Sequence, residues 1–228
     1  MTELLLGDEI LSAYAAGALS GPMRLLLDAH SEVSAEAARE RAQADAVAGL
    51  MLEAEPPAPL RAGALDDVLA IIDAEEAGIG EAGPAAKRQQ HAAGLASKAL
   101  DEILKLPAPV RDLALERGAG WSFGGPGVRT MELLREGPAK AELIRLEPGQ
   151  GVPRHTHDGR EFTLVLCGAY HDGHARYGAG DMAVADPELA HRPVAEEGEV
   201  CIALAVTDGP LSFTGPLGWV QRALGGMN

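Results

Sequence analysis

The sequence is poor in cysteine, in basic residues and in long apolar runs, and each shortage excludes a class of protein. Its 228 residues include two cysteines, which cannot build a disulfide framework and which fit a reducing cytoplasm. No run of about 18 apolar residues occurs, so the sequence predicts no transmembrane helix. The start, MTELLLGDEI, lacks the basic segment and the longer apolar segment of a secretory signal. We therefore expect a cytoplasmic protein with no membrane association.

Positive charge is scarce, and the excess of negative charge is unevenly distributed. The 19 Lys and Arg residues stand against 34 Asp and Glu residues, and the net charge of −15 argues against direct binding of nucleic acid. Residues 1–85 carry 4 basic and 16 acidic residues, a net charge of −12, whereas residues 86–228 carry −3. This acidity has two interpretations, a solvated helical surface or an acidic face that docks a basic partner.

Apolar residues at helical spacing predict four short helices within residues 1–76. Asp8, Ser20 and Ser34 stand where helix caps are expected. The proline-rich segment at residues 56–59 must end the third helix at about residue 53, because proline removes a backbone donor. Helices with so few aromatic residues, 4% of the chain, can barely cover a core alone. We therefore predict a small helical bundle that a partner completes.

The remainder of the chain predicts strands. Residues 77–95 have no apolar period and indicate a flexible linker, which a short helix at 97–105 follows. From about residue 121 the apolar period becomes two. Strands are predicted at residues 128–135, 140–146, 161–167, 181–185 and 200–206. Short strands at this spacing favour a sandwich or a small barrel.

The expected fold class is therefore α+β with more than one domain. We assign residues 1–76 to the helical domain, residues 77–106 to a linker with a short helix, and residues 107–228 to the β domain.

Four residues of the β domain have the types and the spacing of a metal site: His155, His157, Glu161 and His191. In an extended segment the first three share one face, and a third imidazole from a later strand would complete a set of ligands for a divalent transition metal. The alternative is that these are surface histidines in a loop. The spacing favours the metal site.

The same residues resemble the first motif of the cupin family. Gly149, His155, His157, Glu161 and Gly168 match that motif position by position, and the segment GDMAVADPELAH at residues 180–191 is similar to the second. The resemblance implies a double-stranded β-helix, or jelly-roll, barrel in which His155, His157, Glu161 and His191 bind the metal.

The whole architecture resembles the ChrR-type anti-sigma factors. The segments that carry this resemblance are AYAAGAL at residues 13–19, EFTLVL at 161–166 and GAGD at 178–181. It implies that residues 1–76 sequester an extracytoplasmic-function sigma factor. It also implies that the metal-binding cupin domain senses oxidative stress, such as singlet oxygen.

The resemblance fails at the zinc site that this family carries in its N-terminal domain. His30 matches one ligand position, but Leu5, Ser34 and Ala37 occupy the other three. Leucine, serine and alanine cannot replace imidazole and thiolate ligands. We therefore predict no zinc in the N-terminal domain and interpret His30 as an ordinary histidine at a helix end.

Two other functions stay open. A metal-dependent cupin enzyme, a dioxygenase or isomerase with an accessory helical domain, is chemically available, because three His and one Glu can leave open metal positions. A small-molecule ligand of the cupin could release the N-terminal domain. For the regulator, which is not an enzyme, we expect one zinc ion, with iron, manganese and nickel as alternatives.

Three further residues have weaker patterns. Cys167 shares the strand face of Glu161, and we expect it to be a small buried residue. His171 and His174 flank a turn and are expected at a solvated hairpin tip.

Overall fold

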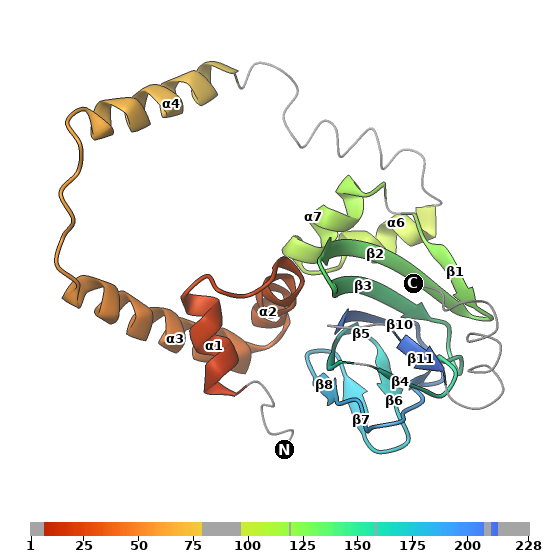
Figure 1. The fold of residues 1–228 in the computed structure, drawn as a ribbon. Coiled ribbons are helices and arrows are strands. Elements are labelled where there is room, and N and C mark those ends of the chain that lie inside the picture. Colours follow the sequence, from red (N-terminus) through yellow and green to blue (C-terminus); the bar gives the residue numbers. More distant parts are fainter. Residues whose placement is uncertain (1–6, 79–96, 119, 158, 208–210, 214–228) are drawn as a thin grey trace.

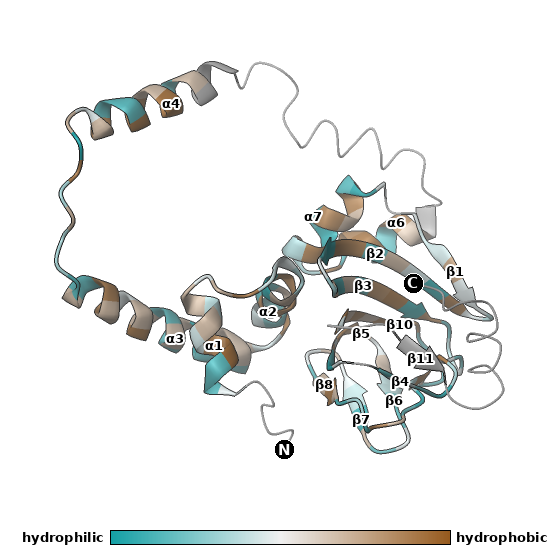
Figure 2. Cartoon of the chain, viewed as in Figure 1, coloured by the Kyte–Doolittle hydropathy of each residue, from teal (hydrophilic) through white to brown (hydrophobic). Residues whose placement is uncertain are grey.

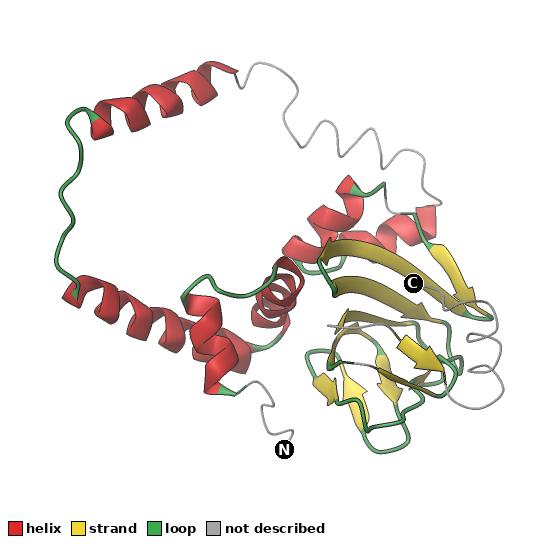
Figure 3. Ribbon diagram, viewed as in Figure 1, coloured by secondary structure: helices red, strands yellow, loops and turns green. Residues whose placement is uncertain are grey.

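The structure is a computed structural model that describes residues 7–78, 97–118, 120–157, 159–207 and 211–213. Helices lie N-terminal to a group of antiparallel sheets (Figures 1 and 3). The helices are α1 (Asp8–Ala15), α2 (Gly21–Val33), α3 (Ala35–Ala54), α4 (Ala64–Gly78), α6 (Ser97–Leu104) and α7 (Ala108–Glu116). None of these helices is both long enough and apolar enough to cross a membrane. Most of the predicted linker, residues 79–96, lies outside the described residues.

The helix boundaries largely follow the predicted caps. Ser34 precedes α3, and its side chain accepts a hydrogen bond from the Ala37 amide. Ser20 precedes α2, with a proline in the first turn. The prediction for Asp8 was wrong by one residue, because Gly7 is the N-cap of α1 and Asp8 lies in its first turn. There the carboxylate faces the positive end of the helix dipole. Helix α7, whose first turn contains Pro109, was not predicted.

The strands of the described residues form three sheets. The large sheet has the order β1-β2-β3-β10-β5-β8, and the small ones have the orders β7-β6-β9 and β11-β4. The members of the large sheet are β1 (Ser122–Gly125), β2 (Val128–Glu136), β3 (Ala139–Leu146), β5 (Glu161–Cys167), β8 (Met182–Ala185) and β10 (Cys201–Thr207). The short strands are β4 (His155–His157), β6 (Ala169–His171), β7 (Arg176–Gly178), β9 (Val194–Ala195) and β11 (Leu211–Phe213). Every pairing is antiparallel, as a jelly-roll barrel requires.

The large sheet separates two apolar cores. We call the cluster on its helix-covered face the outer core, and the cluster on its other face the inner core. The outer core joins residues of α2, α6 and α7 to Leu133, Leu143, Phe162, Leu164 and Leu204. The inner core contains Val128, Leu146, Val165, Tyr170, Ala183, Ala195 and Cys201. Consecutive residues of a strand alternate between the two, so each long strand contributes to both cores.

The outer core extends into the N-terminal helices. Five apolar residues of α2 are buried in it, namely Met23, Leu25, Leu26, Leu27 and Ala29. On its other side α2 contacts α3, and α3 contacts α1. Figure 1 shows α2 at the edge of the sheet, with α1 and α3 beyond it. The barrel thus covers part of the apolar surface that the helices alone could not bury.

Candidate metal centre

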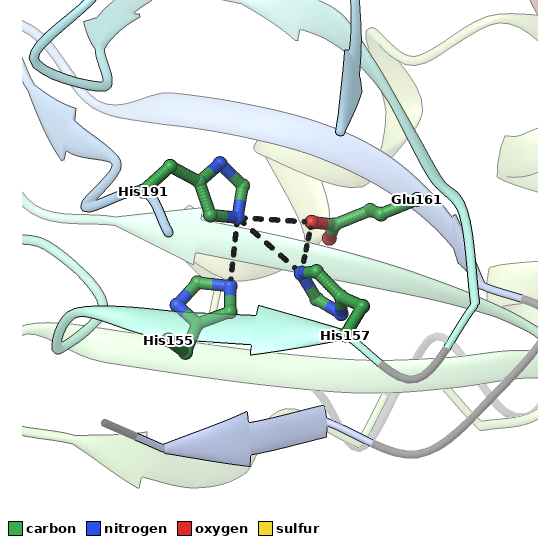
Figure 4. Close-up of side chains that lie close together, drawn as sticks. All are labelled: His155, His157, Glu161 and His191. Carbon is green, nitrogen blue, oxygen red and sulfur yellow. Dashed lines mark hydrogen bonds and ion pairs between the residues drawn. The ribbon is translucent and has the colours of Figure 1, made fainter. Parts of the chain in front are cut away.

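The four predicted ligands converge from three segments (Figure 4). His155 and His157 lie on β4, two residues apart and therefore on one face of the strand. Glu161 is the first residue of β5. His191 lies beside His155, because each of the two backbone amides donates a 3.1 Å hydrogen bond to the carbonyl of the other residue. The backbone alone therefore brings the second motif next to the first.

The side-chain atoms of this group are arranged around one point. The Nε2 atom of His191 lies 3.0 Å from Nε2 of His155 and 3.3 Å from Nε2 of His157. The Oε2 atom of Glu161 lies 2.6 Å from Nε2 of His157 and 3.3 Å from Nε2 of His191. Bond lengths of about 2.1 Å in a tetrahedral zinc site place donor atoms about 3.4 Å apart. Three of the four spacings lie within about 0.4 Å of that value, and all four ligand atoms lie within 4.8 Å of one another.

One of the converging ligand atoms has no hydrogen-bond partner. Glu161 Oε2 is buried and makes no well-directed hydrogen bond, although an imidazole nitrogen is 2.6 Å away. Such short approaches with unsuitable angles are expected where lone pairs point at a shared ion rather than at each other. A second contact orients His155, because its Nδ1 lies 2.8 Å from the Pro153 carbonyl and its Nε2 therefore faces the group. The donor set fits a divalent transition metal.

Burial and neighbouring side chains together set the protonation of His155 and Glu161. All four residues are at most 5% exposed. Desolvation lowers the pKa of His155 to about 4, so its imidazole is neutral and able to bind a metal at pH 7. Burial alone would raise the pKa of Glu161, but the neighbouring imidazoles of His157 and His191 outweigh it and lower this pKa. A neutral imidazole at His155 and an ionised carboxylate at Glu161 are the forms in which these two groups bind a divalent cation.

Comparison with known proteins supports the same architecture. Residues 115–211 match the family described as the ChrR Cupin-like domain. Over 208 residues the chain is 39% identical to the anti-sigma-E factor ChrR of Cereibacter sphaeroides, and the match covers 90% of each chain. The chain belongs to the ChrR family of anti-sigma factors.

Solved structures extend this result to the arrangement of the helices and the barrel. The structure of Rhodobacter sphaeroides SigE in complex with the anti-sigma ChrR matches at 36% identity and a TM-score of 0.67, over 89% of this chain and 97% of that chain. KdgF from Halomonas sp. matches 39% of this chain and 86% of its own at 21% identity, with a TM-score of 0.36. The predicted α+β fold with a C-terminal cupin barrel is confirmed.

In this ChrR-family barrel, the exposure of one predicted residue, Cys167, differs from the prediction, and one buried residue near the site, Tyr170, was not predicted. Cys167 is exposed, so the prediction of a buried thiol was wrong. Between β5 and β10 the register passes from Val165↔Ala203 to Cys167↔Ile202, so Leu166 is an extra residue. This bulge breaks the alternation that the prediction assumed. Tyr170 was missed, although it is buried beside Glu161, because β6 is too short to show a period.

The remaining histidines of the turn lie where they were expected. His171 and His174 are exposed, and between them Asp172 accepts hydrogen bonds from the amides of His174 and Ala175. Within the described part of the chain, the barrel group is the only cluster of three or more His, Cys, Asp or Glu side chains close enough to share an ion.

In the N-terminal helices, the family's zinc positions hold side chains with other roles. Ser34 caps α3, and Ala37 is a buried apolar residue. Leu5 lies outside the described residues. His30 lies in the last turn of α2, as predicted, but it is buried against the Gly180 backbone of the barrel. Desolvation lowers the pKa of His30. These residues do not fit a zinc ion, and its absence stays a prediction.

Proposed function

We propose that this chain is a regulator that binds an extracytoplasmic-function sigma factor through residues 1–76. The observation that carries this proposal is an exposed apolar surface on α4, where five large apolar side chains face solvent: Leu65, Val68, Leu69, Ile71 and Ile72. Figure 2 shows apolar residues along this helix, which stands apart from the barrel. A short helix gains most of its stability from packing of its apolar face, and so large an exposed apolar surface marks a site of interaction with another protein.

The second half of α3 continues this surface. Val47, Leu50, Met51 and Leu52 are exposed on it. Acidic residues flank the apolar ones, among them Asp66, Asp67 and Asp73 on α4. An apolar surface surrounded by carboxylates suits a partner with basic residues around its own apolar patch, as a DNA-binding protein has. The likeness to the SigE–ChrR complex supports the same partner class.

For the barrel we propose one zinc ion held by His155, His157, Glu161 and His191, with iron, manganese or nickel as alternatives. A bound zinc ion would supply a redox-inert cross-link between three segments of the barrel. Four buried protein ligands resemble a closed structural zinc site more than a catalytic site with an open position. This donor set therefore favours a regulatory site over an enzyme's. For the signal, the likeness to an anti-sigma factor supports oxidative stress, including singlet oxygen, and we place the protein in the cytoplasm.

A co-expression experiment tests the partner. Leu69 in α4 and Leu104 in α6 are equally exposed, at 48% and 49%, and form a matched pair. We expect the tagged chain to retain the sigma factor encoded beside it at moderate salt. Leu69→Asp should lose most of the complex and Leu104→Asp should keep it. Equal retention by both variants, or no complex with the wild-type chain, would contradict the proposal.

Metal analysis distinguishes the sensor function from the alternative, a cupin enzyme. Zinc at one ion per chain, with no oxygen consumption, supports the sensor. Bound iron or manganese together with oxygen consumption would support a dioxygenase.

A further inference from the structure

Helix α2 belongs to the helical segment by sequence and to the barrel by packing. Its five buried apolar residues share the outer core with Phe162, Leu164 and Leu166 of β5. At its start the Gly21 amide donates a 2.6 Å hydrogen bond to a carboxylate oxygen of Glu136 on β2. The approach is so close that a Cβ on Gly21 would lie 2.9 Å from the Leu134 side chain. The barrel therefore holds both the face and the first turn of α2.

The C-terminal end of α2 is held by a second pair of contacts. The Glu32 carboxylate accepts a 2.8 Å hydrogen bond from the Ala108 amide at the start of α7. Gly180, in the turn between β7 and β8, lies so close to α2 that a Cβ there would be 3.1 Å from the Val33 carbonyl oxygen. His30 is buried against this turn.

That turn is bonded directly to the strand that carries Glu161. The Gly180 amide donates to the Val165 carbonyl at 2.9 Å, and the Val165 amide donates to the Asp181 carbonyl at 3.0 Å. Val165 shares the inner face of β5 with Glu161, whereas Phe162 and Leu164 on the outer face pack with α2. One strand thus carries a metal-site residue on one face and the support for α2 on the other.

On its far side α2 fixes the other helices. The Tyr14 hydroxyl of α1 donates to the Asp28 carboxylate of α2 at 2.5 Å. Arg41 of α3 lies 3.0 Å from the same carboxylate and stacks over the Tyr14 ring. A displacement of α2 would therefore move α1 and α3 with it.

We propose that α2 couples the metal centre to α1 and α3, so that ion binding in the barrel sets how firmly these two helices, including the α3 part of the proposed partner surface, are held. The inference rests on the proposed metal site and regulator function. When the four ligands share an ion, the ion cross-links β4, β5 and the His191 segment. Strand β5 then forms a rigid surface on which α2 packs. Without the ion, β5 is held less rigidly. Helix α2 then detaches from the barrel more often, together with α1 and α3, which are bonded to it.

Hydrogen exchange on the intact chain, without any sigma factor, tests this coupling. We expect removal of zinc by EDTA to speed exchange of amides in residues 21–33 by about tenfold. Residues 128–146 of β2 and β3 should keep their protection, and α4 should not change. Unchanged exchange in α2 would overturn the proposal. Loss of protection in α2, β2 and β3 together would also overturn it, because the barrel would then be unfolding as a whole.

The reverse direction supplies a second test, because coupling between two sites is reciprocal. Glu32 and Glu136 are exposed and tether α2, so the variant Glu32→Ala/Glu136→Ala is expected to fold. Its zinc affinity, measured by chelator competition, should fall about fivefold or more. Glu132→Ala, which removes an exposed carboxylate of β2 paired with Arg135, is the control and should leave the affinity unchanged. Equal affinities in all three proteins would contradict the coupling. Neither test uses a sigma factor. The results of both tests are therefore independent of the pull-down, which tests the proposed partner.

Discussion

Glu161 and Phe162 are consecutive residues of β5 whose side chains lie on opposite faces of the sheet. Glu161 meets the three imidazoles of the inner side, and Phe162 is buried in the outer core with α2. The distance from the candidate metal centre to the helix-bearing face is therefore the thickness of a single strand. A change at Glu161 on metal binding can therefore reach the packing of α2 through one strand.

Glu161→Gln should impair the metal centre without unfolding the barrel. The change keeps the shape of the side chain but removes the negative charge that balances the cation. We expect zinc affinity to fall by about tenfold or more. Elemental analysis after dialysis against a weak chelator measures the loss, and His171→Gln, in the exposed turn, is the control. In cells the variant should lose the response to oxidative stress and still inhibit the sigma factor.

Leu26→Ala should destabilise the whole chain, not only the helical segment. Leu26 is fully buried in the outer core, and its truncation is expected to cost about 2–5 kcal/mol of unfolding free energy. Leu50→Ala in α3 removes an exposed side chain and should change this free energy by less than about 0.5 kcal/mol. Urea unfolding followed by circular dichroism checks both. If β-sheet signal were lost at the same urea concentration in Leu26→Ala and in the wild type, α2 would not be part of the cooperative unit.

Asp28→Asn should weaken the link among the first three helices. Asp28 accepts the Tyr14 hydroxyl and pairs with Arg41, and both partners are partly exposed. The expected loss is about 1 kcal/mol of unfolding free energy. Asp67→Asn, at the exposed pair with Arg61, is the control and should have almost no effect.

Tyr14 itself reports on this link. Burial and the hydrogen bond to Asp28 raise the pKa of Tyr14 to about 12. In an absorbance titration Asp28→Asn should return the pKa of this phenol toward 10, with Tyr14→Phe identifying the transition. An unchanged titration in the Asn variant would show that the contact with Asp28 does not hold in solution.

His30 should make the chain less stable in mild acid. Its pKa in the folded state is lowered by burial, and the hydrogen bond to the Gly180 backbone and the charge of Asp181 offset part of this effect. A histidine with a lowered folded pKa binds its proton more readily in the unfolded chain, so its contribution is complete above pH 6.5 and decreases below it. Unfolding free energies at pH 7.5 and 5.5, in EDTA, should differ more for the wild type than for His30→Gln. An equal difference in both proteins would exclude this role.

Local patterns were sufficient for much of this molecule. Hydroxyl and proline positions predicted the starts of α2 and α3, because a cap acts within one turn of its own helix. Strand periodicity located β2, β3, β5, β8 and β10, and motif spacing identified the four candidate ligands. These features depend on neighbours in the chain, so a single sequence contains them.

Other features depend on which surfaces meet. The exposure of Cys167 follows from a bulge against β10, and the burial of His30 follows from contact with a turn 150 residues later. Helical periodicity also did not predict that α2 packs on the barrel or that the apolar surface of α4 is exposed. An amphipathic stripe shows that a helix will bury one face, but only packing decides what covers it.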